Sequence, residues 1–410
     1  MFSYIDPGTG SMLFTVLIGV LGAAVYSIRV FIMKLRSRVG GGKVKKAARV
    51  PLAIFSDNKR YFATFDPILR ELSARGQSVL YLTASEDDPA LECKYEGFTA
   101  EYIGPGNRVY TRLNSLDAAV LFSTTPGLDV YQWKRSPKVS YYVHIPHAPA
   151  DVTRYRMFGI DYYDAILLSG EYQIKQIRDL EALRNLPEKE TVLVGIPYMD
   201  DMAARYEKVG PAAPHPRTVL LAPSWGKSAI FGVYGGKIIE DLLATGYHVI
   251  VRPHPQSFQS EPEVIDELIK KYPQSDNLEW NRDLENFDVL NRSDILVSDF
   301  SGVTFDFAFI FDKPIIYTNP DFDRSPYDAW WLEEDLWTER ALPRLGELLT
   351  PENESDLKGL IDRCLEDPRY AEGRREMKEQ TWVFPSEGGR RAAEYLIGKV
   401  AEITKEEAAE

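Results

Sequence analysis

Short apolar runs rich in β-branched residues alternate with longer runs of helical spacing from residue 49 onward. The strand-like runs cover residues 50–55, 78–83, 99–103, 118–122, 138–143, 165–168 and 191–194. Helices are expected at residues 65–75 and 171–183. Strands separated by helices form parallel sheets that helices cover on both faces. Residues 50–199 therefore predict one α/β domain with a parallel sheet.

A second alternating set follows a polar stretch. Residues 200–217 contain three prolines and a glycine, which is typical of an interdomain linker. The next strand-like runs are residues 218–222, 247–251, 295–297 and 314–317, with helices expected at 236–244, 262–272 and 303–311. We therefore expect a second α/β domain at residues 218–385. A C-terminal helix with an acidic tail is expected at residues 386–410, and residues 390–403 are expected to pack back on the first half.

Two α/β halves of similar size that face a cleft are the arrangement of GT-B glycosyltransferases. A chain of 410 residues exceeds the usual limit for a single hydrophobic core, so two domains are expected. The fold class that the pattern predicts is GT-B, with two Rossmann-like parallel-sheet domains facing a cleft and one transmembrane helix before them.

That transmembrane helix comes from the N-terminal pattern. Residues 12–28 are an uncharged apolar run of 17 residues, at the short end for a membrane span. Basic residues follow it, whereas a cleaved signal peptide carries its charge before the apolar run. Too few polar residues interrupt the run for a helix lying in the membrane plane. We expect a membrane anchor at residues 1–34 and a basic, glycine-containing linker at 35–49 whose lysines contact anionic membrane lipid.

The basic flank also sets an expected orientation. Positive charge stays on the cytoplasmic side, so the protein is expected to be single-pass in the cell (inner) membrane with its catalytic domains in the cytoplasm.

The net charge of −13 argues against a nucleic-acid partner. Cys93 and Cys364 have no metal or redox spacing. A metal held by Asp299, Asp306 and histidines has no tight ligand spacing behind it, so no metal and no cofactor are expected.

Four loops follow predicted strands, at residues 141–149, 224–226, 252–255 and 298–306. Ligands of open α/β sheets bind at the carboxyl ends of strands, so all four loops are expected to line one cleft. Three of the five histidines fall in these loops, and an imidazole can take a proton near pH 7. His254 lies in a loop stiffened by two prolines, and Arg252 beside it can hold a diphosphate. His144 and His147 both remain candidates at this point.

The loop at residues 298–306 leads into an apolar helix. Ser301, Gly302 and Thr304 would lie at the start of that helix, where free N–H groups and the helix dipole favour a phosphate. The alternative is that Ser301 only caps the helix. No Walker loop, GxGxxG fingerprint or GxSxG elbow is present in the sequence.

These residues carry a resemblance to a known family. The segment SDFSGVTFD at 298–306, with KPIIY at 313–317, resembles the most distinctive segment of the CDP-glycerol glycerophosphotransferases, the teichoic-acid primases and polymerases of GT-B fold. APSW at 222–225 resembles the family's APxW loop, and RPH at 252–254 its RxH loop. The resemblance covers residues 218–330. Gly302 stands where the family has a second serine.

The first half matches less closely. His147-Ala148-Pro149 is the nearest equivalent of the family's WHGTP-type motif, without its tryptophan and glycine. RPHP with a serine loop is also similar to motifs of bacterial sialyltransferases and polysialyltransferases, which use a CMP-sugar. Both resemblances point to a cytidine nucleotide.

The family resemblance implies a reaction and a set of residues. CDP-glycerol or a related CDP-alditol would be the donor, and a hydroxyl of a lipid-linked or cell-surface polymer the acceptor, with CMP released. The resemblance favours His147 over His144 as base, with His254 stabilising the phosphates or protonating the leaving group. The implied substrate-binding residues are Ser224, Trp225, Arg252, Ser298, Asp299, Ser301, Gly302, Thr304 and Asp306.

Two alternatives remain open from the sequence. One is a GT-B glycosyltransferase that moves a sugar from a nucleotide-sugar for surface polysaccharide synthesis. The other is a membrane-anchored nucleotide-binding protein without catalytic activity, which the looser first-half motif and Gly302 allow.

Overall fold

The computed structural model describes residues 49–409 except 284, 300 and 319–322. The expected anchor at residues 1–34 and nearly all of the expected linker at 35–49 lie outside the described residues. Residues 50–409 belong to one compact unit. Within the described part of the chain, no helix combines the length and apolar character needed to cross a membrane.

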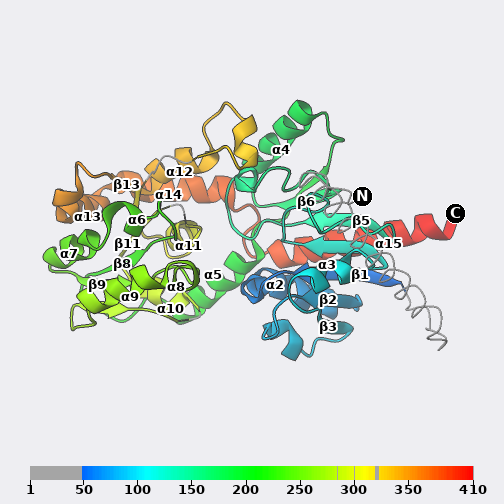
Figure 1. Ribbon diagram of the computed structural model, residues 1–410, viewed down its shortest axis with the longest axis horizontal. Helices are drawn as coiled ribbons and strands as arrows, with labels where there is room; N and C mark the ends of the chain where they lie inside the picture. Colours follow the sequence, from blue (N-terminus) through cyan, green and yellow to red (C-terminus); the bar gives the residue numbers. More distant parts are fainter. Residues whose placement is uncertain (1–48, 284, 300, 319–322, 410) are drawn as a thin grey trace, which may run out of the picture. The chain divides into compact units, whose positions relative to one another are not determined.

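The first half of this unit is built on a seven-stranded parallel sheet (Figure 1) with the order β3-β2-β1-β4-β5-β6-β7. Its strands are β1 Val50–Ser56, β2 Val79–Thr83, β3 Phe98–Tyr102, β4 Ala118–Ser123, β5 Val139–His144, β6 Ala165–Leu168 and β7 Glu190–Leu193. Every residue of β4 and of β6 is buried, as expected for strands covered on both faces. The predicted strands of this half are confirmed to within one or two residues.

Amphipathic helices cover this sheet. In α2, Phe65, Ile68, Leu69 and Leu72 are buried, which is the i, i+3, i+4, i+7 spacing of one helix face. The α-helices of this half are α2 Phe62–Ala74, α3 Asn107–Leu113 and α4 Glu171–Arg184. Short 3-10 helices lie at Lys59–Tyr61, Pro89–Glu92 and Val152–Arg154.

The second half contains a six-stranded parallel sheet of order β10-β9-β8-β11-β12-β13. The strands are β8 Thr218–Ala222, β9 His248–Val251, β10 Leu278–Trp280, β11 Ile295–Ser298, β12 Ile315–Thr318 and β13 Gly346–Leu349. The sequence pattern predicted the four central strands but not the edge strands β10 and β13. Both are short and their burial is only partial, so neither has the continuous apolar run that marks a central parallel strand.

Helices surround the second sheet as well. They are α6 Ile230–Tyr234, α7 Lys237–Ala244, α8 Ser257–Ser260, α9 Pro262–Lys271, α10 Phe287–Asn291, α11 Val303–Ile310, α12 Trp337–Leu345, α13 Leu357–Glu366 and α14 Pro368–Thr381, with 3-10 helices at Asp328–Trp331 and Glu354–Asp356. All residues of α11 after the first are buried. Most of its side chains are apolar, because α5, α14 and the sheet surround the helix.

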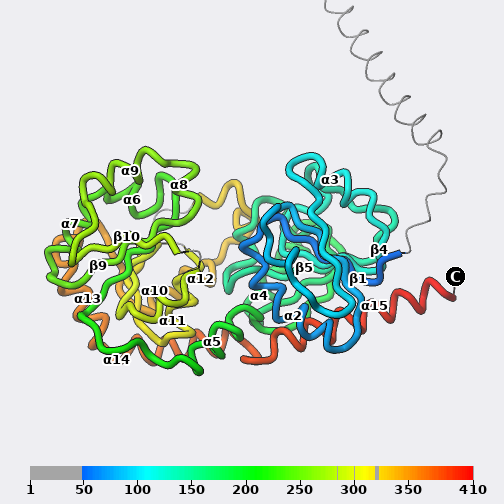
Figure 2. Tube along the Cα trace, turned by 90° about the horizontal axis from the view of Figure 1, so that it is seen from below, coloured from blue at the N-terminus to red at the C-terminus, as the bar shows by residue number. Residues whose placement is uncertain are grey.

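The segment that joins the halves is partly helical. Helix α5, Pro197–Val209, includes the first ten residues of the stretch 200–217 that was expected to be a linker. It lies between the two sheets in both views (Figures 1 and 2) and packs against α2 of the first half and α11 of the second. A proline at its first turn and Gly210 after its last residue match the usual helix boundaries.

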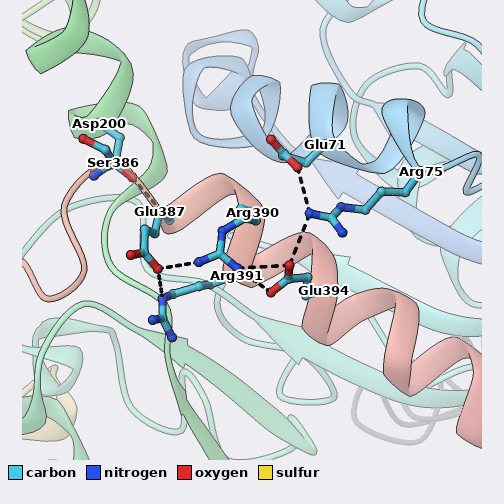
Figure 3. A network of polar contacts seen from close by, with 9 residues as sticks. Glu71, Arg75, Asp200, Ser386, Glu387, Arg390, Arg391 and Glu394 are labelled. Carbon is cyan, nitrogen blue, oxygen red and sulfur yellow. Dashed lines mark hydrogen bonds and ion pairs between the residues drawn. The ribbon is translucent and has the colours of Figure 1, made fainter.

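The C-terminal helix α15, Gly388–Ala409, returns to the first half. Its buried Ala392, Ala393 and Leu396 belong to the same core cluster as Phe65 of α2. Figure 3 shows the polar contacts along this junction, where Glu394 accepts from Arg75 at 3.2 Å. Asp200 of α5 accepts the N–H groups of Ser386 at 2.8 Å and Gly388 at 2.7 Å. The predicted return of residues 390–403 to the first half is confirmed.

Candidate active site

A cavity of about 610 Å³ lies where the two halves meet. The first half contributes residues from the loop after β5, between Pro146 and Tyr155. The second half contributes residues 225–228, which follow β8, together with Gly302 and Phe305 at the start of α11. Asp323, Pro326 and Tyr327, which follow β12, also line it. Loops at the carboxyl ends of parallel strands from both halves therefore form one cavity, as expected for open α/β sheets.

His147 lines this cavity from the first half. Its ring lies 4.8 Å from the ring of Tyr61, centroid to centroid. Burial, with the positive charge of Arg60 as a second cause, lowers the pKa of His147 to about 4. The imidazole is thus neutral at pH 7 and able to accept a proton. Among the described residues, its Nδ1 atom has no hydrogen-bond partner.

His144 has a different position. It is the last residue of β5 and is fully buried. Its Nε2 atom lies 3.1 Å from the hydroxyl of Tyr155, a residue of the cavity wall. Burial lowers the pKa of His144 to about 3, and the nearby His147 acts in the same direction. His144 therefore lies behind the cavity wall, whereas His147 lines the cavity.

The start of α11 faces the His147 loop. Gly302 lines the cavity, and a Cβ atom built on it would lie 3.5 Å from the Cβ atom of Ala148. Ser301 directly precedes Gly302, the N-cap residue of α11, and the carbonyls of these two residues accept the N–H groups of Thr304 at 3.2 Å and Phe305 at 3.0 Å. Thr304 is buried, and its hydroxyl has no partner within the described part of the chain. The positive end of the helix dipole makes this a place for an anion.

Two of the predicted substrate-binding residues support the cavity from behind. Asp299 is fully buried and accepts the N–H groups of Ser224 at 3.0 Å and Ile230 at 3.1 Å. Burial raises the pKa of Asp299, and these hydrogen bonds oppose the rise. The Ser298 hydroxyl donates to the carbonyl of Ala222 at 2.7 Å. These bonds hold the loop after β8, which carries the half-exposed, cavity-lining Trp225.

Arg252 and Asp306 also have protein partners instead of lining the cavity. Arg252 donates to the side chain of Asn281 and to the carbonyl of Asp283, at 2.8 Å for the latter. Asp306 is buried and accepts from the Tyr198 hydroxyl at 2.7 Å, which links α11 to α5. Burial raises the pKa of Asp306 to about 6.

His254 follows β9 and lies next to the loop after β8. The backbone N–H of His254 donates to the carbonyl of Pro223 at 3.2 Å. Its Nδ1 atom accepts the N–H of Gln256 at 3.1 Å. A neutral His254 therefore has its proton on Nε2, where it can be donated to a ligand. Burial, and secondarily the charge of Arg60, lowers the pKa of His254.

The sequence reasoning missed three cations of this region. Arg154 and Lys227 line the cavity, one from each half. Arg60 lies in the loop after β1 and influences the pKa values of both His147 and His254. The rule that ligands bind at the carboxyl ends of parallel strands could have found Arg60 and Lys227. Arg154 lies farther along the segment after β5, so the same rule points to it less directly.

Of the residues predicted from the sequence, His147, Trp225 and Gly302 line the cavity together. Ser224, Ser298, Asp299, Arg252 and Asp306 lie around it with bonds to the protein. No group of three or more His, Cys, Asp or Glu side chains in residues 49–409, apart from the undescribed gaps, is arranged to hold a metal ion. The arrangement offers a neutral imidazole, a helix N-terminus and several cations around one cavity.

Comparison with solved structures shows the same fold in several proteins. A structure of the wall teichoic acid polymerase TagF is 12% identical, covers 94% of this chain and 98% of its own, and has a TM-score of 0.53. The UDP-GlcNAc 2-epimerase of Methanocaldococcus jannaschii is 13% identical, covers 85% and 99%, and has a TM-score of 0.52. The Neisseria meningitidis UDP-GlcNAc 2-epimerase is 12% identical, covers 85% and 99%, and has a TM-score of 0.53. At these identities the likeness shows the fold alone, a GT-B-like pair of parallel-sheet halves.

Sequence comparison identifies the family. No curated protein matches the chain. The model of the CDP-glycerol:poly(glycerophosphate) glycerophosphotransferase family matches residues 160–394, more than half of the chain. This match includes both the loop after β11 and the histidine loop after β9. The chain therefore belongs to the CDP-glycerol:poly(glycerophosphate) glycerophosphotransferase family.

Proposed function

We propose that the protein transfers a glycerophosphoryl group from CDP-glycerol to a hydroxyl of a lipid-linked or cell-surface polymer and releases CMP. The family supports a transferase that uses CDP-glycerol. The observation that carries the residue assignment is the meeting of His147 and the start of α11 at one cavity, where Gly302 lies against Ala148. We therefore assign the base and the anion site to the same cavity.

In the proposed reaction, the acceptor oxygen attacks the phosphorus that carries glycerol. A bond forms between that oxygen and the phosphorus, and the bond from the phosphorus to the bridging oxygen breaks, so CMP leaves with the electron pair. The neutral His147 takes the proton of the attacking hydroxyl. The low pKa of His147, about 4, keeps the ring in its proton-accepting form throughout the neutral range.

Neutralising the diphosphate is the larger task in phosphoryl transfer. We assign it to the positive end of α11, with Ser301, and to the cavity-lining cations Arg154 and Lys227. His254 would donate its Nε2 proton to a phosphate oxygen or to the departing CMP. The Asp299 carboxylate acts indirectly, because it holds the loop that carries Trp225.

The apolar run at residues 12–28 and the basic residues after it support a membrane anchor with the catalytic part on the cytoplasmic side. An anchored enzyme and a lipid-linked acceptor would share one surface. This part of the proposal rests on the sequence.

CMP release from CDP-glycerol by membranes that carry the full chain tests the proposal. Wild type is compared with His147→Ala and His254→Ala, and His215→Ala is the control because His215 lies before β8 and away from the cavity-lining residues. Loss of a positioned acid or base costs about 10²–10⁴-fold in rate. We expect acceptor-dependent release that falls by this factor in the first two variants and stays unchanged in the control. Sugar transfer without phosphate in the new linkage, or CDP-glycerol binding without turnover, would contradict the proposal.

A further inference from the structure

The loop after β1 ends beside the His147 loop. In the sheet, Phe55 pairs with Ser123, and Ser123 pairs with His144. Two residues beyond this row, the three neighbouring strands therefore present Asp57, Thr125 and Pro146 at the same edge. Asp57 thus lies at the carboxyl end of β1, next to the segment that carries His147.

Side-chain contacts join the two loops. The Arg60 guanidinium carbon lies 4.9 Å from the centre of the Tyr61 ring. The Tyr61 ring in turn contacts His147, at 4.8 Å between ring centroids and with a tilt of 51° between the ring planes. Tyr61 therefore contacts both Arg60 and His147, which brings the guanidinium near the candidate base.

Asp57 directly follows β1 and lies three residues before Arg60 in the same segment. Asp57 is an exposed residue. Partial burial of its carboxyl group nevertheless raises the pKa of that group, and the Thr125 hydroxyl and the charge of Arg60 oppose this rise. Burial raises the pKa values of Tyr61 and Tyr155, and the charge of Asp57 acts in the same direction. Among the described residues, neither Asp57 nor Arg60 is joined to an oppositely charged side chain by a salt bridge.

The two groups suit a ligand that has both hydroxyls and a phosphate. A carboxylate accepts hydrogen bonds from hydroxyls, and a guanidinium binds phosphate oxygens in a fork. The donor diphosphate is assigned above to the start of α11. Asp57 and Arg60, beside His147, would therefore form a second site for hydroxyls and a phosphate, and the acceptor is the substrate that remains to be bound.

We propose that Asp57 and Arg60 bind the growing end of the acceptor, with Asp57 accepting a hydrogen bond from its terminal glycerol and Arg60 contacting the phosphodiester next to it. This inference rests on the proposed function. It assigns the acceptor side of the site to the loop after β1. It also makes Arg60 a residue that distinguishes an acceptor with a phosphodiester from a neutral one.

The test measures the acceptor KM and kcat of the full chain in membranes at pH 7.5. The probes are a short lipid-carried oligo(glycerol phosphate) and the matching lipid-carried glycerol without phosphate. The variants are Asp57→Asn and Arg60→Gln, and the control is Asp87→Asn. Asp87 is an exposed carboxylate that follows β2. It pairs with Lys59, which belongs to the same segment after β1 as Asp57 and Arg60. CDP-glycerol affinity is measured separately for every variant.

We expect Asp57→Asn to reduce kcat/KM for both acceptors by about tenfold to a hundredfold, the usual worth of a hydrogen bond to a charged group. Arg60→Gln should lower kcat/KM for the oligo(glycerol phosphate) by a similar factor and for the neutral acceptor by much less. CDP-glycerol affinity should stay within about twofold in both variants, and Asp87→Asn should behave as wild type.

The outcomes separate this inference from the proposed function. An active wild type whose Asp57→Asn and Arg60→Gln variants keep their acceptor parameters would overturn the acceptor site alone. A loss of CDP-glycerol affinity as large as the loss of acceptor kcat/KM would assign both residues to the donor site. That result would also overturn the acceptor-site proposal. A wild type that releases no CMP with either acceptor would remove the proposed function and this inference together.

Discussion

The Asp151 carboxylate accepts the backbone N–H of Trp337 at 2.7 Å. Its other oxygen accepts the N–H of Thr338 at 3.0 Å. Asp151 follows the His147 loop in the first half, and the two N–H groups open α12 of the second half. A buried carboxylate of one half thus caps a helix of the other and fixes the loop that carries the candidate base.

Replacing Asp151 by alanine removes this cap. The buried N–H groups of Trp337 and Thr338 would be left without an acceptor, so the free energy of unfolding should fall by about 2 kcal/mol or more. Chemical denaturation of wild type and variant measures the change. Asp367→Ala is the matched control, because Asp367 caps α14 at a partly exposed site, and its loss should cost about 1 kcal/mol or less. Equal costs at both positions would show that Asp151 does not hold the interface.

Gly302 has a helical backbone, with φ −60° and ψ −24°. An added Cβ would meet only Ala148, at an ordinary contact distance of 3.5 Å. Gly302→Ala should therefore raise the free energy of unfolding by about 0.5 kcal/mol, because alanine has less freedom to lose on folding. Thermal unfolding checks this.

Gly346→Ala gives the opposite expectation. There a Cβ would lie 1.7 Å from the carbonyl oxygen of Ile315, on the neighbouring strand β12. The strands would have to separate, so we expect a loss of at least about 2 kcal/mol. A stabilised Gly346→Ala variant, or a strongly destabilised Gly302→Ala variant, would contradict the packing described for these positions.

Arg184 forms a buried ion-pair network between the halves. It donates to Asp161 at 2.7 Å and to Asp328 at 2.6 Å, and all three side chains are at most 5% exposed. Arg184→Met would leave two buried carboxylates without their cation, at a cost of about 3–5 kcal/mol. Because Asp328 directly follows the cavity-lining Tyr327, CDP-glycerol turnover should fall as well.

A matched exposed pair provides the comparison for Arg184. Arg363 pairs with Asp356 at 3.1 Å, and both side chains are more than half exposed. Arg363→Met should change the free energy of unfolding by at most about 1 kcal/mol. Denaturant titration of both variants distinguishes the buried network from a surface ion pair. A loss below about 1 kcal/mol for Arg184→Met would mean that the network is not maintained in solution.

The pH dependence of the reaction follows from the surroundings of His147. Its pKa of about 4 lies below the usual 6.5 of imidazole, so the ring loses its proton-accepting form only in more acidic solution. We expect kcat/KM for CDP-glycerol to stay flat from pH 7 down to about pH 5 and to fall near pH 4. Arg60→Gln removes a charge that lowers this pKa, so it should move the acidic limb to higher pH. A wild-type limb centred at pH 6.5 would exclude His147 as the base.

The amino-acid sequence determined the fold class and the position of the main loops. Strand-forming runs such as residues 165–168 and 218–222 agree with β6 and β8, because central parallel strands are apolar on both faces and need no tertiary information to be recognised. The motif at 298–306 indicated the family that the family model confirms. The edge strands β10 and β13 escaped prediction, since both are short and only partly buried and lack a continuous apolar run.

Tertiary structure alone decided which side chains reach the cavity. Asp299 and Asp306 belong to the recognised motif, but their carboxylates bind Ser224 and Tyr198. Arg60, Arg154 and Lys227 have no motif of their own, and their relation to the site comes from the folding of three separate loops. Residue types and spacing determine local structure, because strand and helix preferences act over a few residues. The direction of a buried side chain depends on partners that lie tens to hundreds of residues away.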